Sequence, residues 1–284
     1  MSHVLPLRRA PPTTQGRTIA RAAVRALHTE VALYPKPGLV SLIDSGAHHD
    51  MDATTFLRSL FSLRHYFADI ADLGAAGHPF ASLQWLGMRA EQSMLTATGG
   101  INTHRGAIFC LGLLAAAAGW QRARGQKPDR TALARTVGEV WGEAIAEAGS
   151  LSRTSNGSRA VRRYGARGAR EEVLEGFPTL ITVAMPALDE VLNRLGCARR
   201  ARVQALFAVM AELEDTNLLH RGGPDGLAFV QREARLFLER GGVHAPDWME
   251  RAVALHRACI QRHLSPGGAA DVLAAACFLK DLEE

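Results

Sequence analysis

Four short segments of the chain gather charged side chains beside glycine and proline, at places where helices should begin or end. They are 34–51, 99–106, 214–223 and 265–271. The free amides in the first turn of a helix form an anion site, and neighbouring Lys and Arg strengthen it. Aspartate oxygens suit Mg²⁺, which binds through one or two carboxylates together with phosphate groups. The four segments together predict a polyphosphate site with bound Mg²⁺ at one end of a helical bundle.

In the first segment two prolines fix an extended turn, which holds Lys36 on a stiff backbone where its ammonium could meet a phosphate. His48 and Asp50 follow in a non-helical stretch, where the acid could hold a cation. Ordinary turn chemistry with a helix cap would explain the same residues. We take Lys36 and His48 as candidate substrate-binding residues and Asp50 as a candidate metal ligand and catalytic residue.

The second segment leads into an apolar helix that Asn102 or Thr103 would cap. Its first-turn amides form a candidate anion site, with His104 and Arg105 beside it. A helix end running into a new cap would explain the glycines and the asparagine. It would not explain His and Arg on a helix otherwise made of core residues. Asn102, His104 and Arg105 are therefore candidate substrate-binding residues.

The third segment places Asp215 and Asn217 at the end of a long amphipathic helix. An acid at a helix C-terminus opposes the helix dipole at a cost of roughly 0.3–1 kcal/mol. We therefore expect a cation or Arg221 to compensate it, which makes Asn217 and Arg221 candidate substrate-binding residues. Simple exposure to water is the alternative.

The fourth segment predicts a helix start, with Ser265 as the cap. Gly267 and Gly268 leave the first amides open to close approach by a ligand. Asp271 lies one turn further on, so it could assist a phosphate only through a bridging divalent cation. An acid placed favourably for the helix dipole is the alternative.

The stretch 150–170 breaks the helical pattern, and six arginines are mixed there with Gly and Ser. A long irregular loop in a helical protein is usually functional or disordered. We predict a loop that is mobile without ligand and closes on a bound polyphosphate, with Arg163 and Arg167 among its contacts. A solvated surface loop is the alternative.

Helical periodicity runs through almost all of the remaining chain. The first helix ends before Pro35, and Asp52 can cap the second. Further helices are predicted at 81–97, 104–120, 130–148, 178–195, 199–219, 225–240, 246–263 and 268–282. Strand and hairpin signals are missing. We predict an all-α, single-domain helical bundle of about ten helices over 17–284, preceded by a poorly ordered tail over 1–16.

Composition sets the cellular context. The four cysteines have no CxxC spacing, which argues against a disulfide framework or a structural zinc site and favours a reducing compartment. No signal segment or sufficiently long apolar run stands out, so we expect a soluble cytoplasmic protein without membrane contact. Lys and Arg exceed Asp and Glu by 33 to 28, which suits an anionic partner, although many Arg-rich chains are simply basic.

The sequence resembles the triphosphoribosyl-dephospho-coenzyme A synthases over most of its length. The resemblance rests on Glu30 and on five ordered motifs, YPKPGLV at 34–40, GAHHDM at 46–51, GINTHRGAIF at 100–109, DTNLLHRGG at 215–223 and SPGGAAD at 265–271. The stand-alone length and the Arg/Ala-rich style look most like the malonate decarboxylase member. One departure is Ser41, because the citrate lyase branch commonly has Asp-Arg at this point of the first motif.

The resemblance implies a reaction between ATP, as substrate, and 3'-dephospho-coenzyme A. Adenine leaves, and the triphosphoribosyl group joins the 2'-hydroxyl of the dephospho-coenzyme A ribose. The product would pass to a transferase acting on an acyl carrier protein. With the resemblance, Glu30 joins Asp50, Asp215 and Asp271 as an expected Mg²⁺ ligand, and the three aspartates are the expected catalytic residues. A homodimer is left open.

Other functions fit parts of the same pattern. The same reaction could serve citrate lyase. A Mg²⁺-dependent helical ADP-ribosyl hydrolase would also use aspartate clusters, but with water in place of the second nucleotide. A basic module that binds nucleic acid or a carrier protein predicts charges on one exposed face and no buried acids. The acids at glycine-flanked helix ends disfavour that module, and we expect no nucleic-acid partner.

Overall fold

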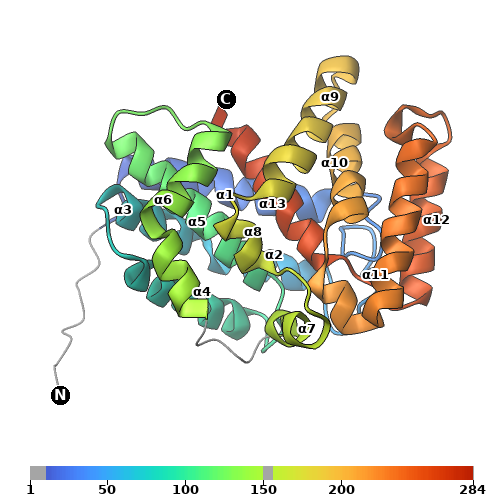
Figure 1. Cartoon of the computed structure of the whole chain (residues 1–284), viewed down its shortest axis with the longest axis horizontal. Coiled ribbons are helices and arrows are strands. Elements are labelled where there is room, and N and C mark those ends of the chain that lie inside the picture. Colours follow the sequence, from blue (N-terminus) through green and yellow to red (C-terminus); the bar gives the residue numbers. More distant parts are fainter. Residues whose placement is uncertain (1–10, 150–155, 284) are drawn as a thin grey trace.

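The computed structural model describes residues 11–149 and 156–283, and helices account for most of them (Figure 1). The first helices are α1 (Thr14–Ala32), α2 (Ala53–Ser62), α3 (Arg64–Ala75), α4 (Phe80–Ala97), α5 (Arg105–Ala123), α6 (Arg130–Gly149), α7 (Asn156–Tyr164) and α8 (Ala169–Leu174). A π-helical segment, η1 (Thr179–Ala184), precedes α9 (Met185–Leu195), α10 (Ala198–Glu212), α11 (Thr216–Glu239), the short 3-10 helix η2 (Gly242–His244), α12 (Trp248–Gln261) and α13 (Gly267–Glu283). The described parts of the chain contain no strand, so the predicted all-α class is confirmed.

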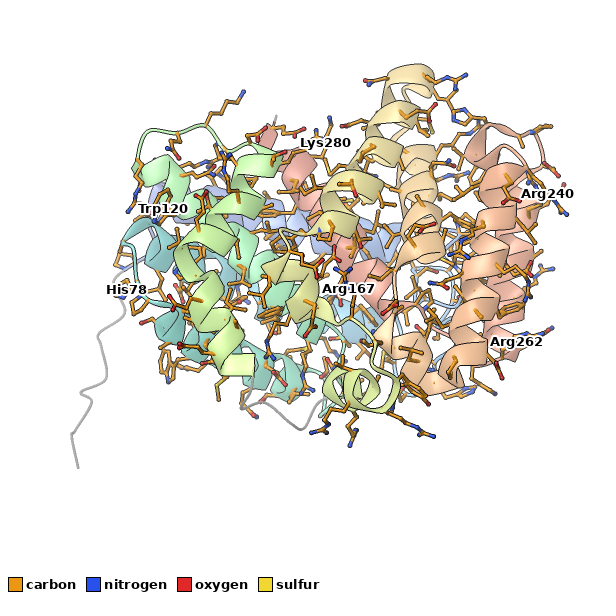
Figure 2. The ribbon with its side chains drawn as sticks, in the orientation of Figure 1. His78, Trp120, Arg167, Arg240, Arg262 and Lys280 are labelled. Carbon is orange, nitrogen blue, oxygen red and sulfur yellow. The ribbon has the colours of Figure 1, made fainter. Side chains whose placement is uncertain are left out.

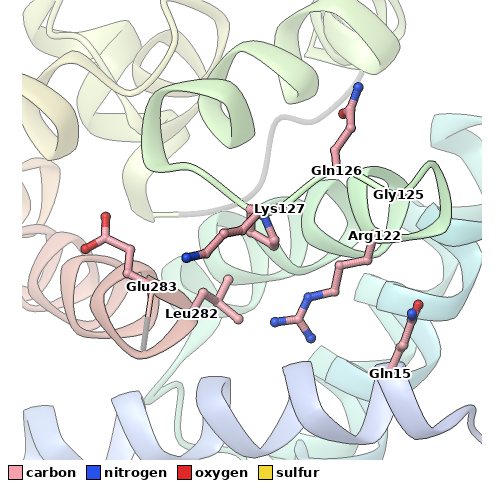
Figure 3. A pocket seen from close by; sticks show the side chains of 8 residues that line it. Gln15, Arg122, Gly125, Gln126, Lys127, Leu282 and Glu283 are labelled. Carbon is pink, nitrogen blue, oxygen red and sulfur yellow. The ribbon is translucent and has the colours of Figure 1, made fainter.

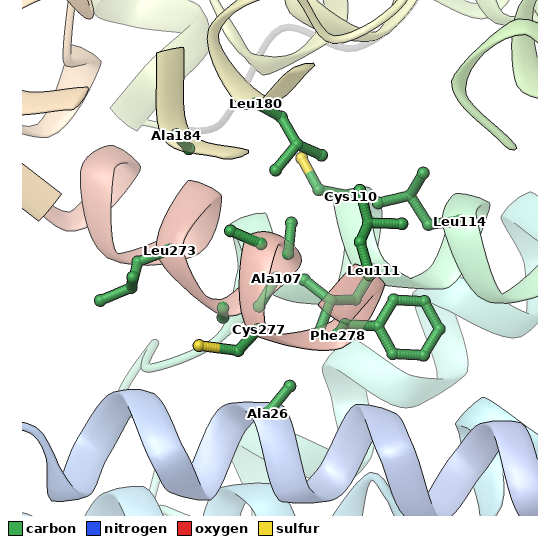
Figure 4. Close-up of a cluster of buried hydrophobic side chains, with 14 of the residues drawn as sticks. Ala26, Ala107, Cys110, Leu111, Leu114, Leu180, Ala184, Leu273, Cys277 and Phe278 are labelled. Atoms are coloured by element: carbon green, nitrogen blue, oxygen red, sulfur yellow. The ribbon is translucent and has the colours of Figure 1, made fainter. Parts of the chain in front are cut away.

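Helix α5 lies at the centre of the core and packs against α1, α3 and α13. Side chains of α5 and α13 meet in Figure 4, and Ala26 of α1 approaches them from one side and Leu180 and Ala184 of η1 from the other. Within the described residues α5 is also the one helix long and apolar enough to cross a membrane. Because most of it is buried inside the molecule, we interpret it as a core helix.

Two glycines let α3 and α5 approach until their backbones touch. A Cβ atom added to Gly74 would lie 2.0 Å from the backbone oxygen of Ala116, and one added to Gly119 would lie 2.0 Å from that of Ala71. Any side chain here would collide with main chain that cannot move without separating the two helices. This crossing fixes where α5 lies, and therefore where its first turn presents residues 104–107.

The first helix begins earlier than predicted. Helix α1 starts at Thr14, inside the segment 1–16 that the sequence assigned to a poorly ordered tail. The Thr13 hydroxyl accepts a hydrogen bond from the Gly16 amide and caps the helix, while Asp72 of α3 accepts bonds from the Thr13 amide and hydroxyl. Residues 1–10 lie outside the described residues.

The arginine-rich stretch is more regular than predicted. Residues 156–164 form α7 and 169–174 form α8, so an irregular loop over this whole stretch is wrong, while 150–155 lie outside the described residues. Ala160 is buried where α7 packs against α11, whereas Arg163 is exposed. A helix with one buried stripe can carry the arginines on its exposed side. The glycines and serines in this stretch hid the helical pattern from the sequence analysis.

Basic side chains spread over the surface of the molecule in Figure 2, where Arg240, Arg262 and Lys280 are labelled. Several lie over aromatic rings, including Arg124 at 3.7 Å from the Trp120 ring centroid and Arg262 at 4.1 Å from that of Phe229. All four cysteines are free thiols, as predicted, and Cys110, Cys259 and Cys277 are buried.

Candidate active site at three helix starts

Asp215 joins the N-termini of α11 and α13. Its carboxylate accepts hydrogen bonds from the amides of Asn217 (2.8 Å) and Leu218 (3.3 Å) in α11 and from the amide of Ala269 (3.0 Å) in α13. The sequence placed Asp215 at a helix C-terminus, and that was wrong, because α10 ends at Glu212 and Asp215 is the N-cap of α11. The dipoles of both helices therefore favour this acid.

The glycines of α13 make room for side chains of the protein. A Cβ atom on Gly268 would lie 3.1 Å from the Asp215 carboxylate, and one on Gly267 would lie 2.7 Å from the side-chain nitrogen Nδ2 of Asn217. Asp215 therefore occupies part of the space where a ligand was predicted to approach the open amides. Ser265 is not the cap of α13 as predicted, because the helix begins at Gly267 and Pro266 directly precedes it.

Asp271 connects α13 to the start of α5. A Cβ atom on Gly106 would lie 1.9 Å from Asp271 Oδ2, and the backbone amide of Ala107 donates a hydrogen bond to the carboxylate. Burial, followed by the negative charges of Asp215 and Glu30, raises the pKa of Asp271 well above its usual value, and the Ala107 amide opposes this only in part. The first turns of α5, α11 and α13 thus meet around two carboxyl groups.

Glu30 and Lys36 form a buried ion pair beside these acids. Lys36 Nζ lies 2.5 Å from Glu30 Oε1, and the Lys36 side chain is only 1% exposed. Burial lowers the pKa of Lys36, while the Glu30 carboxylate works to raise it. The Lys36 ammonium therefore faces the buried Glu30 carboxylate in this structure.

Arg221, His48 and Ser265 form a hydrogen-bonded chain at the edge of the site. Arg221 lies 2.9 Å from His48 Nδ1, and His48 Nε2 lies 2.9 Å from Ser265 Oγ. Arginine can only donate, so Nδ1 accepts and Nε2–H donates to the serine. Arg221 also donates to the carbonyls of Ala47 and His263, and so ties two loops together. Asp50 is exposed, with an oxygen 3.7 Å from His48 Nδ1.

The first turn of α5 is anchored to neighbouring helices. His104 is buried, and its Nδ1 lies 2.6 Å from the hydroxyl of Ser59 in α2. Arg105 pairs with Glu91 of α4. Asn102 Oδ1 accepts a hydrogen bond from the Arg105 amide at 3.2 Å, but the N-cap of α5 is His104, so the prediction that Asn102 or Thr103 caps this helix is wrong.

The two predicted arginines of the 150–170 stretch lie near α11. Arg163 lies over the Tyr164 ring, at 5.2 Å from its centroid. Arg167 pairs with Glu175, and its backbone amide donates to Glu214 at 2.8 Å, next to Asp215 in the chain. Figure 2 labels Arg167 between α7 and α8.

Two polar residues of the site were not predicted. His256 of α12 lies 2.7 Å from the Lys36 carbonyl through Nδ1 and 3.0 Å from Asp44 Oδ2 through Nε2, so it holds the turn that carries Lys36. Ser59 is fully buried on the apolar face of α2. Its spacing of three from Phe56 was the available signal, because a hydroxyl on the inward face of a helix needs a partner.

The predicted four-acid magnesium site does not assemble. Within 11–149 and 156–283 there is no group of three or more His, Cys, Asp or Glu side chains arranged to hold a metal ion. Asp50 is exposed and Glu30 is engaged by Lys36. Asp215 and Asp271 still fit Mg²⁺ in its usual setting, where one or two carboxylates act together with substrate phosphates.

Two hollows of the described surface lie elsewhere. One is lined by Gln15, Arg122, Gly125, Gln126, Lys127, Pro128, Leu282 and Glu283 (Figure 3). The other lies between α6 and the end of α8. Neither is lined by a predicted site residue.

Replacing Asp215 with asparagine should destabilise the fold. The carboxylate caps two helices, while an amide offers a single acceptor oxygen and leaves buried amides unpaired. Loss of a cap costs about 0.5–2 kcal/mol, so we expect a loss of about 2–3 kcal/mol in the free energy of unfolding, measured by urea denaturation. Asp52→Asn, at the exposed cap of α2, is the control, because Asp52 caps a single helix. Equal losses in the two variants would contradict the double cap.

His48, which is half-buried, and His104, which is buried, should make the fold acid-sensitive. Burial, followed by the positive charge of Arg221, lowers the pKa of His48 to about 4. Burial, followed by the positive charge of Lys36, lowers the pKa of His104 to about 3. As the pH falls below about 6.5, the pKa of histidine in the unfolded chain, the unfolded chain binds protons that the folded protein does not bind. The stabilisation present at neutral pH is therefore lost between about pH 6.5 and the folded pKa values.

At pH 5 each histidine should reduce the free energy of unfolding by about 2 kcal/mol relative to pH 7. Urea denaturation at a series of pH values measures this loss. The variant His48→Gln keeps an acceptor for Arg221 and a donor for Ser265 but cannot titrate. It should lose part of the pH dependence, and an unchanged slope would contradict the assignment.

The comparisons with known proteins agree with the resemblance drawn from the motifs. A relative from Klebsiella pneumoniae, 2-(5''-triphosphoribosyl)-3'-dephosphocoenzyme-A synthase, is 42% identical and matches 96% of this chain and 93% of its own length. A probable synthase of the same name from Acinetobacter calcoaceticus is 41% identical, over 91% of this chain and 88% of the relative. No solved structure matches the chain significantly. Residues 16–284 match the family described as ATP:dephospho-CoA triphosphoribosyl transferase, and the chain belongs to this family of transferases.

Proposed function

We propose that this protein transfers the 5-triphosphoribosyl group of ATP to the 2'-hydroxyl of 3'-dephospho-coenzyme A and releases adenine. The observation that carries the proposal is the junction of three helix N-termini around Asp215 and Asp271. Such a junction suits a triphosphate, because helix starts attract anions. It also places a carboxyl group beside the anion site, which this reaction needs at the ribose carbon.

Asp271 is the best candidate for the general base. Glu30 is paired with Lys36, and the oxygens of Asp215 are engaged by backbone amides, whereas the Ala107 amide is the one hydrogen-bond donor to Asp271 among the described contacts. Burial and neighbouring acids raise the pKa of Asp271, which makes its carboxylate a stronger base.

The chemistry balances as a direct displacement at C1 of the ribose. The bond from C1 to N9 of adenine breaks, and its electron pair leaves with the purine. The 2'-oxygen of dephospho-coenzyme A forms the new bond to C1 and gives its proton to Asp271. Adenine leaves as an anion and takes up one proton from solvent, and Asp271 returns its proton to solvent. The carboxylate also stabilises the positive charge that develops on the ribose.

Magnesium, when bound with ATP, would neutralise triphosphate charge that Asp215 and Asp271 otherwise repel. The protein's own part is to hold the triphosphate near the helix starts. Candidate contacts are Ser265, Asn217 and the arginines of the 163–167 region, since Arg binds phosphate through paired donors. We include Arg105 in this proposal, because its pair with Glu91 is partly exposed and such pairs contribute little stability.

The direct test is adenine release. Purified protein with ATP, dephospho-coenzyme A and Mg²⁺ should release adenine, detected by chromatography, in equal amount with the triphosphoribosyl product. Omitting dephospho-coenzyme A should stop the release. Adenine formed equally well without the second nucleotide would favour the hydrolase alternative, and no adenine with both substrates would overturn the proposal.

We further propose that the product serves the acyl carrier protein of a malonate decarboxylase in the cytoplasm. The Arg/Ala-rich composition supports this choice over citrate lyase. A deletion of the gene should remove the prosthetic group from the malonate decarboxylase carrier protein, as measured by its mass. Loss from a citrate lyase carrier alone would place the enzyme in the other pathway.

A further inference from the structure

His104 carries a buried ring nitrogen without a partner. Its side chain lies at the start of α5, and the residue is 3% exposed. Nε2 has no hydrogen-bond partner among the described residues, although Nδ1 is bonded to Ser59. Leaving a buried polar atom unpaired is costly, so such an atom needs an explanation.

A chain of hydroxyls sets the tautomer of this ring. The Thr103 hydroxyl donates to Ser59 Oγ at 2.7 Å, which leaves the Ser59 proton for His104 Nδ1 at 2.6 Å. With Nδ1 accepting, a neutral imidazole carries its hydrogen on Nε2. The unpaired atom is therefore a donor.

The surroundings keep the ring neutral and dry. Burial, followed by the positive charge of Lys36, lowers the pKa of His104 to about 3. Phe56 meets the ring edge-on, with 5.0 Å between the centroids. The next two residues of the chain, Arg105 and Gly106, lead directly to the turn that meets Asp271. A neutral donor beside an aromatic ring suits a neutral heteroaromatic acceptor better than a phosphate.

We propose that His104 Nε2–H donates a hydrogen bond to a ring nitrogen of the adenine leaving group, and that Ser59 is the positioning residue that fixes this tautomer. The inference rests on the proposed function. When the bond from C1 to adenine breaks, the electron pair moves onto the purine, and its ring nitrogens become better acceptors. The hydrogen bond strengthens as the reaction proceeds, so it assists departure, and the proton stays on Nε2.

Two serines of α2 provide a matched pair of variants. Ser59→Ala removes the bond to His104, while Ser62→Ala removes a hydroxyl that donates to the Ser59 carbonyl and leaves the ring alone. We expect Ser59→Ala to lower kcat for adenine release by about ten- to a hundredfold. We expect Ser62→Ala to stay near the wild type, with both variants showing cooperative thermal unfolding. Equal kcat values for the two variants would overturn the inference.

Two substrate analogues identify the acceptor. In 3-deaza-ATP and 7-deaza-ATP one ring nitrogen is replaced by C–H. One of them should react slowly with the wild type, and Ser59→Ala should slow that analogue little further, because the bond is already lost. If Ser59→Ala slows ATP, both analogues and 1-deaza-ATP by the same factor, His104 does not act on the purine.

A spectroscopic readout is independent of turnover. Nitrogen-15 NMR of labelled protein should show His104 with a protonated Nε2 and an unprotonated Nδ1, and Ser59→Ala should disturb this pattern while Ser62→Ala preserves it. The opposite tautomer in the wild type would overturn the inference. Failure of the proposed function is distinguishable, since the wild type would then release no adenine at all.

Discussion

Replacing Asp271 with asparagine is expected to lower adenine release by about a thousandfold while the protein stays folded. General acid–base groups typically contribute a factor of about 10²–10⁴, and one backbone amide, that of Ala107, donates to Asp271. Because burial and two neighbouring acids disfavour its charge, a neutral amide of the same shape should leave the thermal midpoint unchanged or raise it. Turnover by chromatography and thermal unfolding by circular dichroism measure both effects.

The same helix offers a matched control. Asp281 of α13 forms an ion pair with Arg25 at 2.7 Å, away from the helix start, so Asp281→Asn should keep its activity. Gly106→Ala tests the position of the Asp271 carboxyl rather than its presence, since the new methyl group would overlap Asp271 Oδ2. It should also lose most activity. Full activity in both Asp271→Asn and Gly106→Ala would remove Asp271 from the mechanism.

Gly74→Ala should cause a large loss of stability. The added methyl carbon would lie 2.0 Å from the Ala116 backbone oxygen, so α3 and α5 must separate. Overpacking of this kind costs about 3 kcal/mol, which corresponds to a fall of roughly 6–12 °C in the thermal midpoint. Differential scanning calorimetry gives the midpoint.

Gly138→Ala in α6 is the matched control, because nothing lies within 4 Å of the added Cβ atom. Alanine is the better helix former by about 1 kcal/mol, so this variant should be slightly more stable than the wild type. If both variants shift the midpoint in the same direction, close backbone packing is not the reason for Gly74.

The helices could be predicted because their signal is local. Apolar residues at spacings of three and four place α4, α6 and α12 within a few residues of their observed bounds. The motifs likewise pointed to residues that lie close together, since Asp215 accepts from an amide of α13 and its charge acts on Asp271. What failed were statements that depend on partners distant in sequence.

Lys36 and Asp215 illustrate this limit. The stiff turn around Lys36 is visible in the sequence. Where the Lys36 side chain points depends on Glu30, and where the turn lies depends on His256 of α12, which bonds to the Lys36 carbonyl. Asp215 follows an apolar helix and precedes another, and only the break after Glu212 distinguishes a cap from a C-terminal acid. The acid that seemed to oppose one dipole is stabilised by two.

The rate at which reagents label the buried thiols can report how often the core of the molecule opens. Burial raises the pKa of Cys259 and of Cys277 to about 12, and raises that of Cys110 as well. Thiol reagents attack the thiolate, so in the native state they should modify the half-buried Cys197 first. The slower labelling of the other three would then record how often the core around α5, α12 and α13 opens. Bound nucleotide should slow that labelling if it holds the helix starts together.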